Sequence, residues 1–241
     1  MRIKLLIPMY LFEVRFEAFD SCPIFAENTD MRRKLDETAI YAELFPRKLT
    51  KGDLTRLKII QAAIHCIAKQ GIENLTFEAV GKRMGMNRAQ IKYHFTQKET
   101  LVDHAYDYVI SVAQKMVIER LKVAETWKDQ LCAVVNGFFD WAETYPEQGS
   151  VFLLFYYTAT FNPQHRKLHT RIGEMGDDRI VAILEKVKSQ KNWSDGEVHL
   201  IALLIWAVTD GLMVYHLSGE KMHDAQSYRK AALKAVSKLI S

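Results

Sequence analysis

Residues 76–101 contain a dense group of cationic, amide and aromatic side chains. The spacing predicts a short helix from Arg88 to Phe95, with Ile91 and Phe95 on one side. Its other side carries donors, cations and a phenol: Arg88, Gln90, Lys92, Tyr93 and His94. Guanidinium and carboxamide groups pair with base edges in the DNA major groove, which admits an α-helix. The pattern therefore predicts a helix that reads duplex DNA.

A preceding helix and a tight turn must position this reading helix. Thr76 is a good N-cap, and Leu75 before it can pack against Val80. Gly85 can adopt the left-handed conformation that ends a helix, and Asn87 can then cap the next one. These signals predict two short helices joined by a turn, the helix-turn-helix arrangement.

Residues 56–101 resemble the DNA-binding domain of the TetR/AcrR family of bacterial transcriptional regulators. The matching segments are RLKIIQAAIHCIAKQG, LTFEAVGKRMGM and NRAQIKYHFTQKETL. The resemblance implies an all-α fold, in which an N-terminal three-helix DNA-binding domain is followed by a larger helical ligand-binding and dimerisation domain. Three positions depart from the family pattern: Ala89 replaces a frequent Gly, Lys92 replaces a frequent Tyr, and Gly81 replaces Ala, which should weaken its helix by roughly 0.5–1 kcal/mol.

The resemblance also implies DNA contacts residue by residue. Tyr93, His94 and Lys98 would contact phosphates, although His94 could instead pack within the domain. Thr76 would lie at a phosphate beside a helix N-terminus, a role compatible with a plain N-cap. The expected DNA-binding residues are Thr76, Asn87, Arg88, Gln90, Lys92, Tyr93, His94 and Lys98.

Two of these side chains are candidates for reading bases directly. Arg88 can pair with guanine and Gln90 with adenine, each through two hydrogen bonds. Either could instead contact only the DNA backbone, which positions a protein without reading sequence. Upstream, Arg47, Lys48 and Lys51 could form a basic arm or a solvated run of charge.

The charge distribution agrees with a small DNA-binding domain. Residues 51–100 contain nine Lys or Arg against four Asp or Glu, whereas residues 101–241 contain 16 against 17. The net charge of +4 thus comes from the segment with the helix-turn-helix pattern. One basic domain facing a polyanion produces this asymmetry.

The composition favours long helices, and the cysteine content is consistent with a reducing compartment. Only 5 Pro and 11 Gly occur in 241 residues. Three cysteines without a CxxC pair argue against a disulfide framework or a zinc knuckle and are consistent with the cytoplasm. The uncharged stretches 148–164 and 198–208 are too short to cross a membrane, so we expect no membrane partner.

Helical periodicity and caps predict most of the remaining elements. Capping boxes are expected at Thr96 with Glu99, at Thr126 with Asp129, and at Ser194 with Glu197. The expected helices are 53–70, 96–125, 126–145, 150–161, 164–189, 195–217 and 224–240. The domains would be an N-terminal extension over 1–50, the helix-turn-helix domain over 51–100, and the effector-binding and dimerisation domain over 101–241.

The larger region should contain a ligand pocket and a dimer interface. Aromatic residues are concentrated on two successive predicted helices, although aromatic residues at helical spacing are often ordinary core. Sites between helices of a bundle are largely apolar. The residues expected to line a pocket are Phe138, Phe139, Phe155, Tyr156, Trp206 and Met213. By resemblance, the ligand is a small-molecule effector of unknown identity, and the homodimer forms through Asp195–Leu217 and Asp224–Ile240. Symmetry then implies a double-stranded DNA operator with an inverted repeat.

The sequence contains no GxSxG, HExxH, Walker or dinucleotide-binding motif, and we expect neither a catalytic residue nor a cofactor nor a metal. His165 and His169 are four residues apart, but the surrounding Arg and Lys favour a solvated basic helix over a metal site. The expected function is a ligand-responsive transcriptional regulator that acts as a repressor and is released from DNA by its effector. The alternative is a helical interaction protein that has lost DNA binding. Met31 is a second candidate start, which would remove most of the N-terminal extension.

Overall fold

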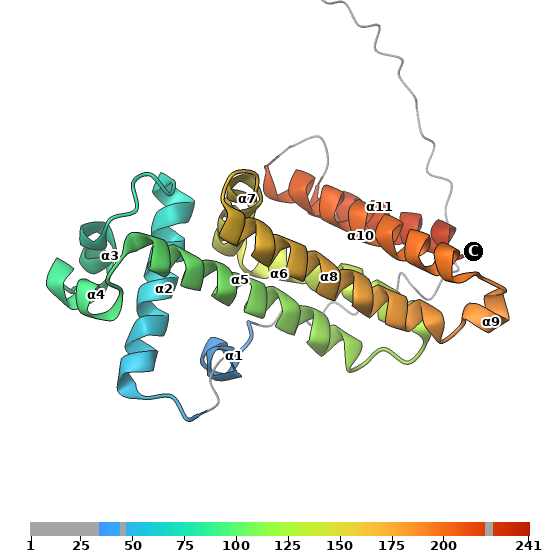
Figure 1. The fold of residues 1–241 in the computed structure, drawn as a ribbon, viewed down its shortest axis with the longest axis horizontal. Coiled ribbons are helices and arrows are strands. Elements are labelled where there is room, and N and C mark those ends of the chain that lie inside the picture. Colours follow the sequence, from blue (N-terminus) through green and yellow to red (C-terminus); the bar gives the residue numbers. More distant parts are fainter. Residues whose placement is uncertain (1–33, 44–46, 220–223) are drawn as a thin grey trace, which may run out of the picture.

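The computed structural model describes residues 34–43, 47–219 and 224–241, and these form helices without a strand. Residues 1–33, which include the alternative start Met31, lie outside the described residues. The expected all-α class is confirmed (Figure 1). The helices are α1 Glu37–Glu43, α2 Lys51–Gln70, α3 Phe77–Met84, α4 Arg88–His94, α5 Lys98–Leu121, α6 Trp127–Thr144, α7 Pro146–Ala159, α8 Pro163–Glu185, α9 Lys188–Lys191, α10 Asp195–Leu217 and α11 Ala225–Leu239.

The small N-terminal domain is built as its caps predict. Thr76 accepts a hydrogen bond from the backbone N–H of Ala79 and begins α3. Gly85 ends it in the left-handed conformation, with φ of 67°. Ile91 of α4 and the following Phe95 are buried, His94 is half-buried, and the other residues of α4 are exposed. Figure 1 shows α3 and α4 together at one end of the molecule, away from α9.

Gly81 has a packing reason that the sequence did not reveal. A Cβ atom at this position would lie 2.4 Å from the carbonyl oxygen of Met86, in the turn between α3 and α4. The turn closes tightly there, because the Met86 N–H donates to the Gly81 carbonyl at 2.9 Å. The absent methyl group therefore permits close contact of backbone with backbone, which offsets the lower helix propensity of glycine.

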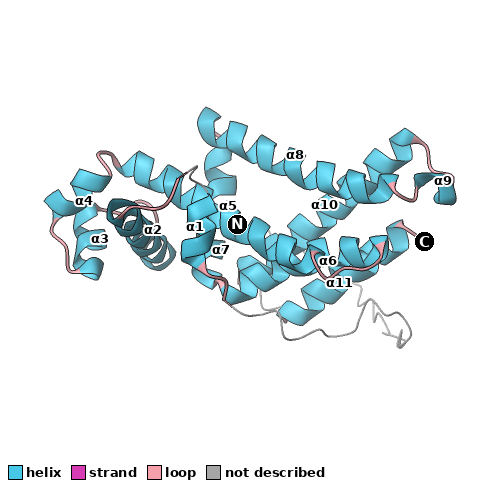
Figure 2. Cartoon of the chain, turned by 90° about the horizontal axis from the view of Figure 1, so that it is seen from below, coloured by secondary structure: helices cyan, strands magenta, loops and turns pink. Residues whose placement is uncertain are grey.

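The larger domain is a bundle that shares α5 with the small one. The buried cluster runs without interruption from Ile59 and Ile60 of α2, through α5, to Val236 of α11. Small residues bring helices close: a Cβ on Gly137 would meet the backbone of Val117 at 2.6 Å. Figure 2 shows α8 and α10 lying along each other in this bundle.

Gly176 allows a close contact between α8 and α10. A Cβ atom there would lie 2.5 Å from the indole ring of Trp206, atom Cζ3. The ring therefore rests directly on the backbone of α8, and this contact holds it against the inside of the bundle.

Several predicted boundaries are confirmed and others are wrong. The capping boxes at Thr126 and Ser194 are present, and the helix 195–217 has the expected ends. The box expected at Thr96 is absent: α5 begins at Lys98, after Gln97, whose side chain makes no capping bond. The helix expected from 150 begins at Pro146, because proline is favoured in a first turn. The helix expected over 164–189 is divided into α8 and α9.

Helix α1 was not expected, and it joins the two domains. Ile40 and Tyr41 are buried, and the Tyr41 ring meets Tyr108 of α5 edge-on, with centroids 6.3 Å apart. The Gln61 carboxamide of α2 donates to Glu37 at 2.6 Å, and the Tyr108 hydroxyl donates to the same carboxylate. Part of the N-terminal extension is thus integral to the fold.

Helix α10 is the one helix among the described residues that is long and apolar enough to cross a membrane. We expected no membrane span because the apolar stretch 198–208 is short, but α10 extends beyond that stretch at both ends. One side of it packs in the bundle through Val198, Ala202, Ile205, Thr209 and Met213. Its other side leaves Leu200, Leu203 and Tyr215 more than half exposed, at 55%, 58% and 58%. An apolar stripe beside a packed one is also typical of a surface that another protein covers.

Gly81→Ala should destabilise the protein although alanine is the better helix former. The clash with Met86 is an overpacking cost of about 1–3 kcal/mol, against a propensity gain of roughly 0.5–1 kcal/mol. We expect a net loss of about 1 kcal/mol in chemical denaturation. Gly196→Ala is the control, because a Cβ there meets no atom within 4 Å. Equal stability of the two variants would contradict the packing argument.

Candidate nucleic-acid interface and internal cavity

Helix α4 presents its polar face to solvent. Arg88, Gln90 and Lys92 are exposed, and the Tyr93 side chain is 85% exposed. Ile91 is fully buried and Phe95 nearly so. A shallow open hollow runs along this face, lined by Met86, Asn87, Ala89, Gln90, Tyr93 and His94. The seven-residue helix therefore has the alternation of faces that entry into a groove requires.

Asn87 and Gln90 hold the start of α4 through reciprocal bonds. The Gln90 N–H donates to Asn87 Oδ1 at 2.9 Å, and the Asn87 N–H donates to Gln90 Oε1 at 2.8 Å. A two-bond contact with adenine uses both the oxygen and the nitrogen of a glutamine. Gln90 must therefore release its cap to make that contact, or bind a base through its nitrogen alone.

Arg88 forms an ion pair that DNA could replace. Its Nε lies 3.0 Å from Glu78 Oε1 of α3, and both side chains are more than half exposed. An exposed pair of this kind is worth about 0–1 kcal/mol, so exchanging it for a base edge or a phosphate costs little.

The remaining expected contacts lie at the other end of α4. The Tyr93 and His94 rings meet edge-on, with centroids 5.2 Å apart. His94 is half-buried, and its carbonyl accepts a bond from Arg56. Lys98 differs from expectation, because its Nζ donates to the carbonyl of Ile72 at 2.6 Å. This lysine fastens the connection between α2 and α3, and a phosphate would have to draw it away.

Arg47 likewise has an intramolecular role. Its guanidinium donates twice to Asp53, at 2.7 and 3.2 Å, and Asp53 also accepts from Thr50 at the start of α2. The Arg47 and Thr50 bonds hold the pKa of this carboxyl well below its usual range. Arg47 therefore stabilises the start of α2. This role differs from both sequence-based interpretations, a basic arm and a solvated run of charge.

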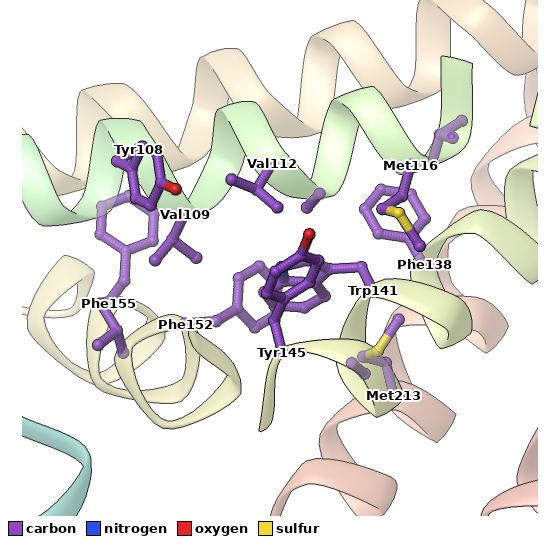
Figure 3. Close-up of a cluster of buried hydrophobic side chains, with 14 of the residues drawn as sticks. Tyr108, Val109, Val112, Met116, Phe138, Trp141, Tyr145, Phe152, Phe155 and Met213 are labelled. Atoms are coloured by element: carbon purple, nitrogen blue, oxygen red, sulfur yellow. The ribbon is translucent and has the colours of Figure 1, made fainter. Parts of the chain in front are cut away.

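The larger domain contains a cavity of about 60 Å³ between α5, α6, α7, α8 and α10. By the same measure one water needs about 10–15 Å³, so the cavity has room for a compact small molecule. Five of the six residues expected in a pocket line it: Phe138, Phe155, Tyr156, Trp206 and Met213. Figure 3 shows the neighbouring Phe152 and Phe155 gathered on one side of α5.

Phe139, the sixth expected residue, lies elsewhere. It is fully buried against His216, with ring centroids 6.0 Å apart, and beneath the guanidinium of Arg229. Adjacent residues on a helix point about 100° apart, so Phe138 and Phe139 cannot both face the cavity.

Four polar residues of the cavity were missed from the sequence: Gln114, His169, Thr209 and Asp210. Gln114 is only 9% exposed, and its Oε1 has no hydrogen-bond partner among the described residues. Asp210 accepts a bond from the Tyr156 hydroxyl. Burial raises the pKa of this carboxyl, and the Tyr156 bond opposes the shift. The sequence could have indicated Asp210 as a cavity residue, because it is the one acidic residue in the largely apolar stretch 198–217.

The aromatic rings and the two acceptors, Gln114 and Asp210, determine which kind of ligand would fit the cavity. Ring faces of Phe, Tyr and Trp attract cations. A buried carboxylate without a cationic partner is costly, and a positively charged guest relieves that cost. His169 also lines the cavity: its charge opposes the rise in the pKa of Asp210, and its ring meets Tyr156 edge-on, with centroids 4.6 Å apart.

The two histidines of α8 face inward, so a solvated basic helix was the wrong interpretation for them. His165 is 8% exposed; its Nδ1 lies 2.8 Å from Thr158 Oγ1 and its Nε2 3.1 Å from Asp103. Within the described residues, no three His, Cys, Asp or Glu side chains come together as a metal site would require.

Together, the capped α3–α4 pair, the outward polar face of α4 and the separate helical bundle define a helix-turn-helix regulatory protein. Comparison with known proteins gives the family. The profile described as "Bacterial regulatory proteins, tetR family" matches residues 59–105. The profile described as "BetI-type transcriptional repressor, C-terminal" matches residues 127–241. The chain therefore belongs to the TetR family of transcriptional regulators.

Curated relatives and solved structures agree. The chain is 23% identical over 180 residues to the HTH-type transcriptional regulator BetI of Brucella suis, covering 75% of this chain and 88% of that one. It is 24% identical over 183 residues to BetI of Serratia proteamaculans, covering 75% and 90%.

Two solved structures share the fold. A transcriptional regulator from Saccharomonospora viridis, determined in complex with choline, superposes with a TM-score of 0.67 at 20% identity, covering 76% of this chain and 96% of that one. A TetR-family regulator from Cytophaga hutchinsonii has a TM-score of 0.68 at 20% identity, covering 80% and 96%.

Arg88→Ala should weaken binding to a selected operator and relax preference at one base pair of each half-site. Loss of a two-bond guanine contact costs about 1–3 kcal/mol. Fluorescence anisotropy with duplexes substituted at each position measures both effects. Lys128→Ala is the control, since it removes one exposed charge from the start of α6, remote from α4. A uniform loss across all duplexes would instead assign Arg88 to the DNA backbone.

Proposed function

We propose that this protein is an effector-responsive repressor that binds an inverted-repeat operator as a homodimer. One observation carries the DNA-binding part: α4 is anchored by Ile91 and Phe95 while Gln90, Lys92 and Tyr93 all face outward. In this proposal Arg88 and Gln90 contact bases, and Thr76, Tyr93 and His94 contact phosphates. A helical interaction protein without DNA binding would have no need of a cationic, solvent-facing helix on so basic a domain.

The dimer would form through α10 and α11. The outward side of α10 supplies a stripe of apolar side chains: Leu200, Leu203, Leu204 and Tyr215. Helix α11 lies beside it, and Tyr215 stacks on Tyr228 of α11 with rings 7° from parallel. Two such helices from each protomer would bury the stripe in a four-helix contact. The two-fold axis would then present two copies of α4 to one face of the duplex.

The effector would be a small organic cation of the quaternary ammonium type. Phe138, Phe152, Phe155, Tyr156 and Trp206 supply ring faces, Asp210 supplies a countercharge, and Gln114 supplies an acceptor. A quaternary ammonium group has no N–H that needs an acceptor, so it suits an aromatic enclosure better than a primary ammonium group does. The choline bound to the Saccharomonospora viridis regulator supports this class, and choline is the first ligand to test.

The effector would act by a population shift. Helix α5 lines the cavity through Ile110, Ala113 and Gln114, and its first turns pack in the small domain through Leu101 and Val102. A guest that favours one position of α5 thereby favours one spacing of the two α4 helices. Operator affinity falls when that spacing no longer matches successive grooves, and the effect is reciprocal.

Selection of bound duplexes from a random pool tests the DNA-binding proposal. We expect an inverted repeat to be enriched, with affinity that falls steeply with salt because several phosphates are contacted. If no sequence is enriched and binding is absent at low salt, the interaction-protein alternative replaces the regulator proposal.

Leu203→Glu should disrupt the dimer, because it places a charge at the centre of the proposed apolar contact. Light scattering after gel filtration should give a monomer mass for the variant and a dimer mass for the wild type, and operator affinity should fall sharply. Val123→Glu is the control, since Val123 is also exposed but lies after α5. A wild-type monomer, or recruitment of the wild type to lipid vesicles through α10, would contradict the dimer assignment.

Asp210→Asn should reduce choline affinity at least tenfold, since it keeps an acceptor for Tyr156 and removes the charge. Calorimetric titration with choline chloride measures this. For the wild type, affinity should fall as the pH decreases through the raised pKa of Asp210, because protonation also removes the charge. The ionised, buried carboxylate destabilises the fold above that pKa, so the variant should melt at a higher temperature at neutral pH.

A neutral ligand of the same shape separates the contribution of ligand charge to affinity from that of ligand shape. The alcohol 3,3-dimethyl-1-butanol is the uncharged carbon isostere of choline and should bind both proteins equally weakly. Choline binding that is unaffected by Asp210→Asn would exclude the cation assignment while leaving the DNA-binding proposal intact.

A further inference from the structure

Helix α4 is too short to hold its own position. It has seven residues, and an isolated helix of that length is not stable in water. Its first turn is held by the Asn87 cap, whereas its last turn ends at Phe95 in an extended conformation. The carbonyl groups of a last turn have no partner within their own helix. Something outside α4 must therefore hold this end.

Arg56 of α2 occupies that position. Its Nη1 donates to the carbonyl of His94, the last residue of α4. Its guanidinium carbon lies 4.2 Å from the centroid of the Phe95 ring, the distance of a cation–π contact. One side chain thus holds both the terminal carbonyl of α4 and the aromatic residue that follows.

The other edge of the same guanidinium faces α5. Arg56 Nη2 lies 3.1 Å from Nε2 of His104. Burial and the nearby Arg56 charge lower the pKa of His104, so the ring is neutral and this nitrogen can accept. The His104 ring also meets Phe95 edge-on, with centroids 5.5 Å apart. Arg56, Phe95 and His104 therefore form one packed unit between three helices.

We infer that Arg56 is a positioning residue for the reading helix, and that it connects this helix to α5. The inference rests on the proposed DNA-binding function. Arg56 is half-buried, and its donors are directed at His94, at His104 and at the Tyr41 hydroxyl of α1 rather than outward. A guanidinium can bridge two acceptors with its planar fork while stacking on a ring, and a lysine ammonium cannot do all three.

The connection gives α5 a route to the reading helix. His104 is on the same continuous helix as Ile110, Ala113 and Gln114, which line the cavity. A displacement of α5 caused by a guest would move His104 and, through Arg56, the end of α4. This is a contiguous chain of packed and hydrogen-bonded groups, which is a physical basis for coupling two sites.

Arg56→Lys and Arg56→Gln test the inference by operator titration at several salt concentrations. Both variants should bind the selected operator about 10- to 100-fold more weakly, the loss expected for a charge-assisted hydrogen bond. The slope of log affinity against log salt should stay at the wild-type value, because no phosphate contact is removed. If Arg56 contacts DNA directly, the lysine variant should retain most of the affinity and the glutamine variant should lower the slope by about one per protomer. That outcome would overturn the inference.

Two controls isolate the positioning role. His104→Ala should weaken operator binding by itself, and its effect should be non-additive with Arg56→Gln in a double-mutant cycle, since the two residues act through one contact. Lys58→Ala removes an exposed charge from the same helix and should leave the salt-independent part of the affinity unchanged. Full additivity of the Arg56 and His104 effects would show that they are not one unit.

Hydrogen exchange of the free protein provides a readout that does not depend on DNA. Arg56→Gln should accelerate exchange in residues 88–95 and leave α10 as protected as in the wild type, because only local opening becomes easier. Unchanged protection of residues 88–95 would overturn the positioning role even if the protein bound no DNA. Failure of the wild type to bind any duplex, with exchange altered as expected, would contradict only the proposed function.

Discussion

The anchoring of α4 is the constraint on which the rest of the structure depends. Seven residues must remain helical and project their polar side chains, although only Ile91 and the adjoining Phe95 are buried. The surrounding parts provide what α4 lacks: the Asn87 cap at its start, the tight turn allowed by Gly81, and Arg56 at its end. The polar side chains proposed to contact DNA thus lie on a short helix whose position is set by residues outside it.

A second constraint arises from the buried carboxylate in the bundle. Asp210 is placed among aromatic rings, where the Tyr156 hydroxyl donates to it and the charge of the nearby His169 opposes the rise of its pKa. Such a residue destabilises the fold in its ionised form, as the raised pKa indicates. In the proposed function this cost favours positively charged guests, because they offset the burial of the carboxylate.

Helix caps, which depend only on residues close together in the sequence, were mostly predicted correctly. The caps at Thr76, Asn87, Thr126 and Ser194 are each defined by residues three or four positions apart, and all are present. The Thr96 box failed because two residues with suitable side chains are not enough when the chain begins its helix later, at Lys98.

Properties that depend on distant contacts could not be predicted in the same way. Phe138 and Phe139 are alike in sequence, and only the rotation of α6 against its neighbours decides which one faces the cavity. Lys98 and Arg47 looked like phosphate-binding cations, and their acceptors, the Ile72 carbonyl and Asp53, are chosen by folding. Helix α1 had no clear periodicity, and its value lies in buried contacts with α5.

The contact between Gly176 and Trp206 has a consequence for how related proteins could come to recognise different molecules. The indole forms one wall of the cavity, and it is held from behind by the bare backbone of α8. Any larger residue at 176 would push this wall inward. The size of the cavity would then change through a residue that does not line it, while the aromatic rings and the carboxylate that do line it stay in place.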